Sequence, residues 1–180
     1  MRWMWIDRIV ALDKGVRCQA VKNVSLAEEH LHDHFPGTPI MPVPLIIEGM
    51  AQTAGILVGH ARNFAEKVIL AKITRATFDR DVYPGQTLFY DATLDRIDDV
   101  GAATTGVVSL LDHASSPTPI AAQRSEGFRP PNANDGPSEI GAIEIMFSHV
   151  DRNMAGLEFP EENFVFTDQF FNLLRNSGMM

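Results

Sequence analysis

Extended segments dominate the pattern of hydrophobic and polar positions along the chain. Residues 3–12 and 16–24 are rich in β-branched and aromatic side chains, and the separator Asp13-Lys14-Gly15 is typical of a hairpin turn. Four further segments of the same character follow with short polar or proline-rich separators: 68–78, 86–97, 102–111 and 120–128. Strands joined by short turns predict an antiparallel sheet rather than repeated strand–helix–strand units.

One long helix interrupts these strands. Residues 34–44 contain four prolines and cannot form regular structure, whereas residues 45–59 are mostly apolar. Proline is tolerated in the first turn of a helix, so the helix is expected to begin at Val43 or Pro44 and to run to about Asn63. Because the segment has no clean polar face, we expect neighbours on most of its sides. The order of elements therefore predicts an α+β fold in which an antiparallel sheet wraps a long central helix.

A run rich in proline and small polar residues follows the predicted strands and marks a boundary in the chain. Its 180 residues correspond to one domain with an appendage, and the run 130–137, PPNANDGP, is typical of a linker. We expect a sheet-and-helix domain at 1–129, a linker at 130–141 and a C-terminal extension at 142–180. The end of the extension predicts a short amphipathic helix with Thr167 at its cap. This aromatic segment is expected to cover the core, or to form a lid or an interface element.

Charge and cysteine content indicate which partners the chain can bind and in which cellular compartment it works. Fifteen Lys and Arg against 23 Asp and Glu give a net charge of −8, and no basic stripe is visible, so nucleic-acid binding is disfavoured. The single cysteine, Cys18, excludes an intrachain disulfide and is expected to be buried in a strand. Asp7 and Arg8 interrupt the N-terminal apolar run, so no signal peptide is predicted. No membrane span is predicted either, and a cytoplasmic protein is the expectation.

A histidine and an isolated acid are the candidate chemical groups. Glu48 lies inside the apolar helix, where burial favours the protonated carboxyl that a general acid needs. His34 begins the proline-rich turn just before that helix, and its imidazole can accept a proton near neutral pH. The N–H groups at a helix start suit a developing oxyanion. Together they describe removal of an α-proton from a thioester with departure of a β-hydroxyl. The alternative for Glu48 is a structural pairing with an arginine or a backbone donor.

The run HFPGTPIMPVPLIIEGMAQTAGIL, residues 34–57, closely resembles the signature of the bacterial β-hydroxyacyl-[acyl-carrier-protein] dehydratases. These are the FabZ/FabA group of hotdog-fold enzymes. The resemblance extends from about Trp5 to the strand near Gly127. It implies the hotdog fold, with an acyl tunnel beside the central helix. It also implies a homodimer, or a trimer of dimers, whose sites lie across the subunit interface.

The resemblance also implies roles for single residues. His34 corresponds to the catalytic histidine and Glu48 to the catalytic carboxylate. Met41, Gly37 and the backbone N–H of Val43 are implied to bind substrate. The implied reaction is reversible dehydration of a (3R)-hydroxyacyl thioester of acyl carrier protein or coenzyme A to the trans-2-enoyl thioester, in fatty acid biosynthesis. No metal or organic cofactor is implied.

The helix start departs from the family pattern. The family has Met-Pro-Gly followed by an apolar residue, whereas this chain has Met41-Pro42-Val43-Pro44. Pro44 has no N–H and biases Val43 away from helical dihedral angles. A changed oxyanion geometry is therefore expected. A hotdog acyl-thioesterase and a non-catalytic hotdog module that binds acyl groups or a partner remain alternatives.

Two further groups of charged or ligating residues have weaker interpretations. The run His30-Leu-His32-Asp33-His34 lacks one residue of the spacing found in metallo-hydrolases, so a metal site is disfavoured. Five basic residues after the central helix are expected to form a rim for an acidic acyl carrier protein, or simply a solvated face. They are Arg62, Lys67, Lys72, Arg75 and Arg80.

Overall fold

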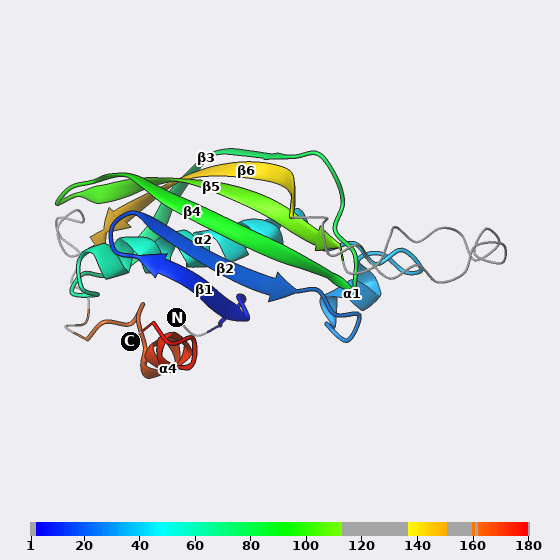
Figure 1. Ribbon diagram of the computed structural model, residues 1–180, viewed down its shortest axis with the longest axis horizontal. Helices are drawn as coiled ribbons and strands as arrows, with labels where there is room; N and C mark the ends of the chain where they lie inside the picture. The colour runs from blue at the N-terminus through cyan, green and yellow to red at the C-terminus, as the bar shows by residue number, and fades with distance from the viewer. Residues whose placement is uncertain (1–2, 113–136, 151–159, 161, 180) are drawn as a thin grey trace.

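A single curved sheet encloses the central helix. The computed structural model describes residues 3–112, 137–150, 160 and 162–179 (Figure 1). Within them the strands are β1 (Arg8–Asp13), β2 (Arg17–Asn23), β3 (Val68–Phe78), β4 (Gln86–Ile97), β5 (Gly101–Asp112) and β6 (Ser138–His149). The helices are α1 (His30–Asp33), α2 (Val43–Ala61) and α4 (Asp168–Asn176). All strand pairs are antiparallel, in the order β1-β2-β4-β5-β6-β3, which confirms the predicted α+β hotdog architecture.

Strand β6 lies inside the sheet, between β5 and β3. Ile143 pairs with Gly106 of β5 and with Ala76 of β3, and its side chain is fully buried. The sequence assigned residues 142–180 to a C-terminal extension and indicated a further strand at 140–150, and β6 is found there. The proline-rich run before β6 resembles a linker locally, whereas strand pairing depends on distant partners. The strand predicted at 120–128 lies outside the described residues.

Helix α2 forms the centre of the core, as its apolar pattern predicted. Every residue from Gly49 to Gly59 is buried. The helix begins at Val43 in spite of the bias that Pro44 imposes, because the first turn needs no N–H from Pro44. The N–H groups of Leu45 and Ile46 both donate to the carbonyl of Pro42, at 2.9 and 3.3 Å. Burial of each large apolar side chain contributes about 1.5–3 kcal/mol.

Two glycines let α2 and the sheet approach closely. A Cβ atom at Gly49 would lie 2.3 Å from Cζ of Tyr90 on β4, and one at Gly106 would lie 2.2 Å from Sδ of Met50. Both distances are far shorter than van der Waals contact, so any larger residue at these positions requires the packing to move. At Gly49 the helix backbone therefore lies directly against the curved sheet.

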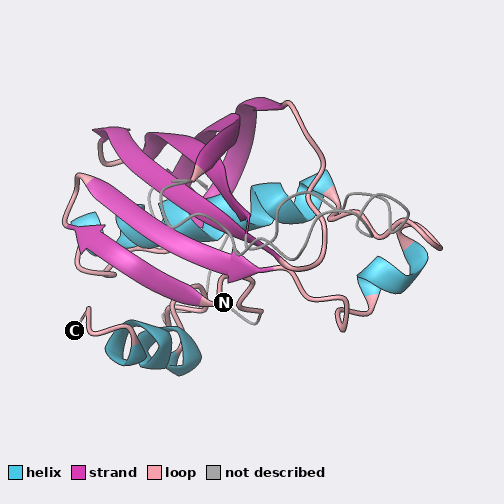
Figure 2. Ribbon diagram, turned by 45° about the vertical axis from the view of Figure 1, so that its right-hand side comes forward, coloured by secondary structure: helices cyan, strands magenta, loops and turns pink. Residues whose placement is uncertain are grey.

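Helix α4 lies near β1 and both chain ends, at the opposite end of the molecule from α1 (Figures 1 and 2). The rings of Phe166, Phe170 and Phe171 surround Phe64, with centroid distances of 4.9, 5.3 and 5.5 Å. Phe170 is fully buried, and Thr167 occupies the N-cap position as predicted. This segment therefore packs into the core. None of the helices in the described part of the chain is long and apolar enough to cross a membrane.

Candidate active site

The turn before α2 holds the His34 ring in one orientation. The N–H of Ile40 donates to the His34 carbonyl at 2.9 Å, and Phe35 and Thr38 exchange backbone hydrogen bonds. Gly37 has φ of +79° in this turn, a conformation that glycine adopts without strain. His34 Nδ1 lies 2.9 Å from the Ile40 carbonyl oxygen. Because a carbonyl can only accept, Nδ1 carries the proton, and Nε2 of the neutral ring is left to accept one.

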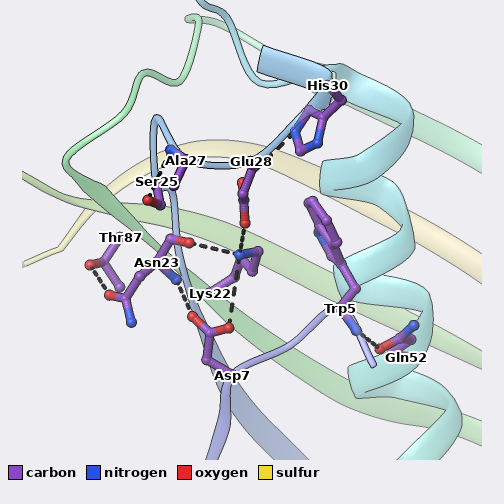
Figure 3. Close-up of polar contacts among 10 residues, drawn as sticks. All are labelled: Trp5, Asp7, Lys22, Asn23, Ser25, Ala27, Glu28, His30, Gln52 and Thr87. Carbon is purple, nitrogen blue, oxygen red and sulfur yellow. Dashed lines mark hydrogen bonds and ion pairs between the residues drawn. The ribbon is translucent and has the colours of Figure 1, made fainter. Parts of the chain in front are cut away.

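Gln52 orients the isolated acid. The backbone N–H of Trp5 donates to Gln52 Oε1 at 2.8 Å (Figure 3). Gln52 Nε2 donates to the Trp3 carbonyl at 2.9 Å, and the two bonds together determine the orientation of the amide. The same Nε2 donates to Glu48 Oε1 at 2.7 Å. Within the described residues Glu48 Oε2 has no protein hydrogen-bond partner. A proton on this carboxyl therefore belongs on Oε2, the oxygen that is free to donate it.

The role of Gln52 was missed in the sequence, although its position contained a signal. Residues four apart on a helix are neighbours, so Gln52 was placed to reach Glu48. Trp5 and Trp3 precede Gln52 in the chain by 47 and 49 residues respectively, so no local pattern predicts these bonds.

A buried lysine anchors the chain that leads into the site (Figure 3). The Lys22 side chain is 7% exposed, forms an ion pair with Glu28 and donates to the Asn23 carbonyl at 2.8 Å. Its Nζ lies 4.7 Å from the centroid of the Trp5 ring. Glu28 Oε2 is in turn 3.8 Å from His30 Nε2. These contacts join β2, the N-terminal segment and the start of α1, and so position the backbone just before His34.

The structure does not bring His34 and Glu48 together within one chain. Glu48 lines a pocket of about 130 Å³ between α2, β3 and β6, and His34 is absent from its lining. The lining residues are Glu48, Ala51, Gln52, Gly55, Val68, Leu70, Phe147, Val165 and Phe166. His34 instead stacks on Phe35, with ring centroids 4.1 Å apart. Within one chain, His34 and Glu48 therefore have different neighbours.

The residues predicted to bind substrate occupy three different environments. Met41 is only 1% exposed and its N–H donates to the Val82 carbonyl at 2.8 Å, so its side chain belongs to the core. Gly37 lies in the exposed turn after His34. Val43 is 42% exposed at the first position of α2, where its N–H points out of the helix start.

The histidines of the run 30–34 have separate partners. His32 Nε2 lies 3.0 Å from the Leu26 carbonyl, His30 lies beside Glu28, and His34 is bound to Ile40. In the portion of the chain that the structure describes, no group of three or more His, Cys, Asp or Glu could hold a metal ion. Cys18 is fully buried in β2 as predicted, and burial, followed by the charge of Asp91, raises the pKa of its thiol to about 12.

A FabA-like domain matches residues 2–112, and the chain belongs to this family. A curated relative from Fusobacterium nucleatum, "3-hydroxyacyl-[acyl-carrier-protein] dehydratase FabZ", is 45% identical over 97 residues, which cover 53% of this chain and 67% of the relative. A protein of the same name from Oenococcus oeni is 39% identical over 102 residues, 56% of this chain and 73% of the relative. The predicted family is therefore confirmed.

Solved structures share the fold at low sequence identity. A Streptococcus mutans protein bound to acetyl CoA has a TM-score of 0.55 at 11% identity, over 82% of this chain and 91% of its own. A conserved Pseudomonas aeruginosa protein has a TM-score of 0.52 at 13% identity, over 78% of this chain and 86% of its own. At such identities the likeness shows the fold alone.

Proposed function

We propose that this chain catalyses the reversible dehydration of a (3R)-hydroxyacyl thioester to the trans-2-enoyl thioester, the reaction indicated by the names of its curated relatives. His34 Nε2 removes the α-proton, and the electron pair of that C–H bond forms the new double bond. The C–O bond at the β-carbon breaks as Glu48 Oε2 protonates the departing hydroxyl, which leaves as water. The observation that carries the proposal is the orientation of both groups: Ile40 leaves Nε2 of His34 as a base, and Gln52 leaves Oε2 of Glu48 as an acid.

Strand β3 supports a site that is completed by a second copy of the chain. It is an outer strand of the sheet, and all residues from Leu70 to Thr77 are exposed. Leu70 and Ile73 are 42% and 40% exposed, and an apolar edge strand is a template for pairing with another strand. We infer a homodimer through β3 in which His34 of one copy faces Glu48 of the other.

Sedimentation at micromolar concentration tests the dimer. Ile73→Lys should shift the chain to monomer and abolish turnover with it. Val10→Lys is the matched control, because Val10 is 37% exposed on β1 at the other edge of the sheet. A wild-type chain that sediments as a monomer would refute the shared site.

We infer that an acidic acyl carrier protein binds a basic face, and the five predicted residues differ in their exposure and partners. Lys67 is 7% exposed and cannot present its charge, and Arg62 lies 3.5 Å from Asp99. Arg80 is exposed and lies 3.7 Å from Asp79. Two basic residues are exposed on β3 itself, namely Lys72 and Arg75, of which Arg75 lies 4.0 Å from Glu144. Charge reversal at these two should raise KM for a carrier-bound substrate and spare a coenzyme A thioester. An equal effect on both substrates would dismiss this face.

Turnover of hydroxyacyl and enoyl thioesters tests the proposed function. The dehydratase interconverts them without releasing a free thiol. An acyl-thioesterase releases the thiol, and a non-catalytic module binds the thioester without either change. Thiol release in place of enoyl formation would overturn the proposal in favour of the thioesterase.

A further inference from the structure

The pocket beside Glu48 extends along α2 toward the C-terminal segment. Glu48 and Gln52 supply its polar groups, and Gly55 lies two turns further along the same helix. At 1.5 Å per residue, Glu48 and Gly55 are about 10 Å apart along the helix axis. Val68, Leu70 and Phe147 supply apolar surface from β3 and β6. The pocket is therefore polar at one end and apolar along the rest of its length.

Val165 and Phe166 form the wall at the apolar end. They lie outside residues 2–112, the part of the chain that the FabA-like domain matches. The Phe166 ring is 4% exposed and packs so closely on α2 that a Cβ atom at Gly59 would lie 2.3 Å from its Cζ. Its centroid is 4.9 Å from that of Phe64. The wall is thus packed against the C-terminal end of the helix that carries Glu48.

Asn163 fixes the backbone of this wall. Its side-chain Nδ2 donates to the carbonyls of Phe64 and Glu66, at 3.1 and 3.3 Å. Its Oδ1 accepts from the N–H groups of Val165 and Phe166, at 3.0 and 3.1 Å. One side chain therefore binds the wall to the connection between α2 and β3, and displacing the wall breaks these bonds.

We propose that Val165 and Phe166 close the far end of the acyl-binding pocket and restrict the substrate to short-chain acyl thioesters. This inference rests on the proposed function for the position of the thioester at Glu48. The size of the pocket supports it, because an apolar cavity of about 150 Å³ holds one benzene-sized group, and this pocket measures about 130 Å³. A longer acyl chain must push aside a packed phenyl ring and the backbone that Asn163 holds.

Phe166→Ala removes the wall. Activity of the full chain is measured on 3-hydroxyacyl thioesters of coenzyme A whose acyl chain grows by two carbons at a time. Each methylene newly accommodated adds about 0.8 kcal/mol, which is about fourfold in kcat/KM. The variant should therefore gain about 15-fold, relative to wild type, for each two-carbon step beyond the wild-type limit.

Phe171→Ala is the matched control. It removes the same ring from the same aromatic cluster, where Phe171 contacts Phe64 at a centroid distance of 5.5 Å, but it does not line the pocket. Its chain-length profile should equal that of wild type. An equal shift in both variants would overturn the proposal, because it would trace the change to loosening of the whole segment.

Gly55→Ala tests the same pocket without removing core packing. A Cβ atom there would lie 3.5 Å from Cε1 of Phe147, an ordinary contact, so the helix accepts it while the pocket becomes smaller. The optimum should move to shorter chains, opposite to Phe166→Ala. Unchanged profiles in folded Gly55→Ala and Phe166→Ala proteins would refute the proposed wall.

Calorimetric binding of saturated acyl thioesters of coenzyme A separates this inference from the proposed function. Binding requires no turnover. If no variant forms enoyl product but the binding profile still shifts with chain length, the wall stands and the dehydratase assignment fails. If wild type turns over and neither variant changes the binding profile, the wall fails and the dehydratase assignment stands.

Discussion

The two ends of α2 are held by different kinds of interaction. At its N-terminal end the chain passes through an exposed turn. There His34 is held by its backbone carbonyl, which accepts from the Ile40 N–H, and by its ring Nδ1, which donates to the Ile40 carbonyl. Val43, at the first position of the helix, is 42% exposed. At its C-terminal end Phe64, Phe166 and Phe170 pack ring against ring, and Phe170 is fully buried. Directional polar contacts orient His34 and Glu48 at the first end, whereas apolar burial holds the second.

This difference teaches that chemistry and stability are largely separable along one helix. Substitutions near the N-terminal end should remove turnover and keep the fold. Substitutions of cluster residues that do not line the pocket, such as Phe170, should lower stability and keep turnover. Four experiments test this separation.

His34→Ala and Glu48→Gln should show the largest effect, on turnover alone. A general acid or base contributes about 10²–10⁴-fold to the rate, so each variant should lose enoyl formation to that extent while its unfolding transition is unchanged. Turnover of coenzyme A thioesters and denaturant unfolding measure the two quantities. His32→Ala is the matched control, because His32 is exposed and its ring Nε2 lies 3.0 Å from the Leu26 carbonyl oxygen. A folded His34→Ala protein with the wild-type rate would exclude His34 as the base.

Phe170→Ala should show the reverse. Truncating a fully buried phenylalanine costs about 3–5 kcal/mol of the free energy of unfolding, and urea denaturation measures that loss. Phe164 is 45% exposed, so Phe164→Ala should lower stability by less than Phe170→Ala does. Equal losses in the two variants would show that the cluster is not the stabilising contact.

Restoring the family residues at the helix start, Val43→Gly with Pro44→Val, should preserve or raise turnover. The double change returns an N–H at position 44 and opens space beside the thioester, and one oxyanion donor is worth about 2.7–4 kcal/mol of barrier. Steady-state kinetics on the shortest active substrate measures the change. A large fall would mean that Val43-Pro44 forms a specialised acyl site.

The smallest expected effect is a pH dependence of the stability that His60 contributes near the C-terminal end of α2. Burial, followed by the charge of Lys14, lowers the pKa of its ring. The unfolded chain, with a histidine pKa of about 6.5, then binds more protons than the folded chain below that pH. Stability due to a neutral His60 is present above about pH 6.5 and falls as the pH drops toward the lowered pKa. His60→Gln should flatten the decline in melting temperature between neutral and mildly acidic pH, and an identical decline would exclude this group.

Local patterns predicted the elements whose signal lies within their own residues. The bounds of β3 and β4 and the start of α2 match the prediction, because each has a continuous apolar or β-branched run next to prolines or turn residues. His34 and Glu48 were found because their surroundings are unusual in the sequence itself. Whether these two act as base and acid stays a prediction.

What could not be predicted depends on contacts between distant residues. The position of β6 between β5 and β3 requires partners about 28 or more residues away in the chain. The hydrogen bonds of Gln52 to Trp3 and Trp5 depend on where the N-terminal segment crosses α2. Burial of Lys67 likewise follows from packing that its own neighbours in the sequence do not reveal.

The contact between Gly49 and Tyr90 also has an evolutionary consequence. A side chain at position 49 would collide with the fully buried ring of Tyr90, so that ring must shift or shrink to accept it. Loss of the ring would cost about 3–5 kcal/mol. The two positions should covary among descendants, with few viable intermediates. A lineage that abandoned dehydration would still inherit the glycine beside its former acid, so in an alignment this glycine traces ancestry of the fold and not retention of the chemistry.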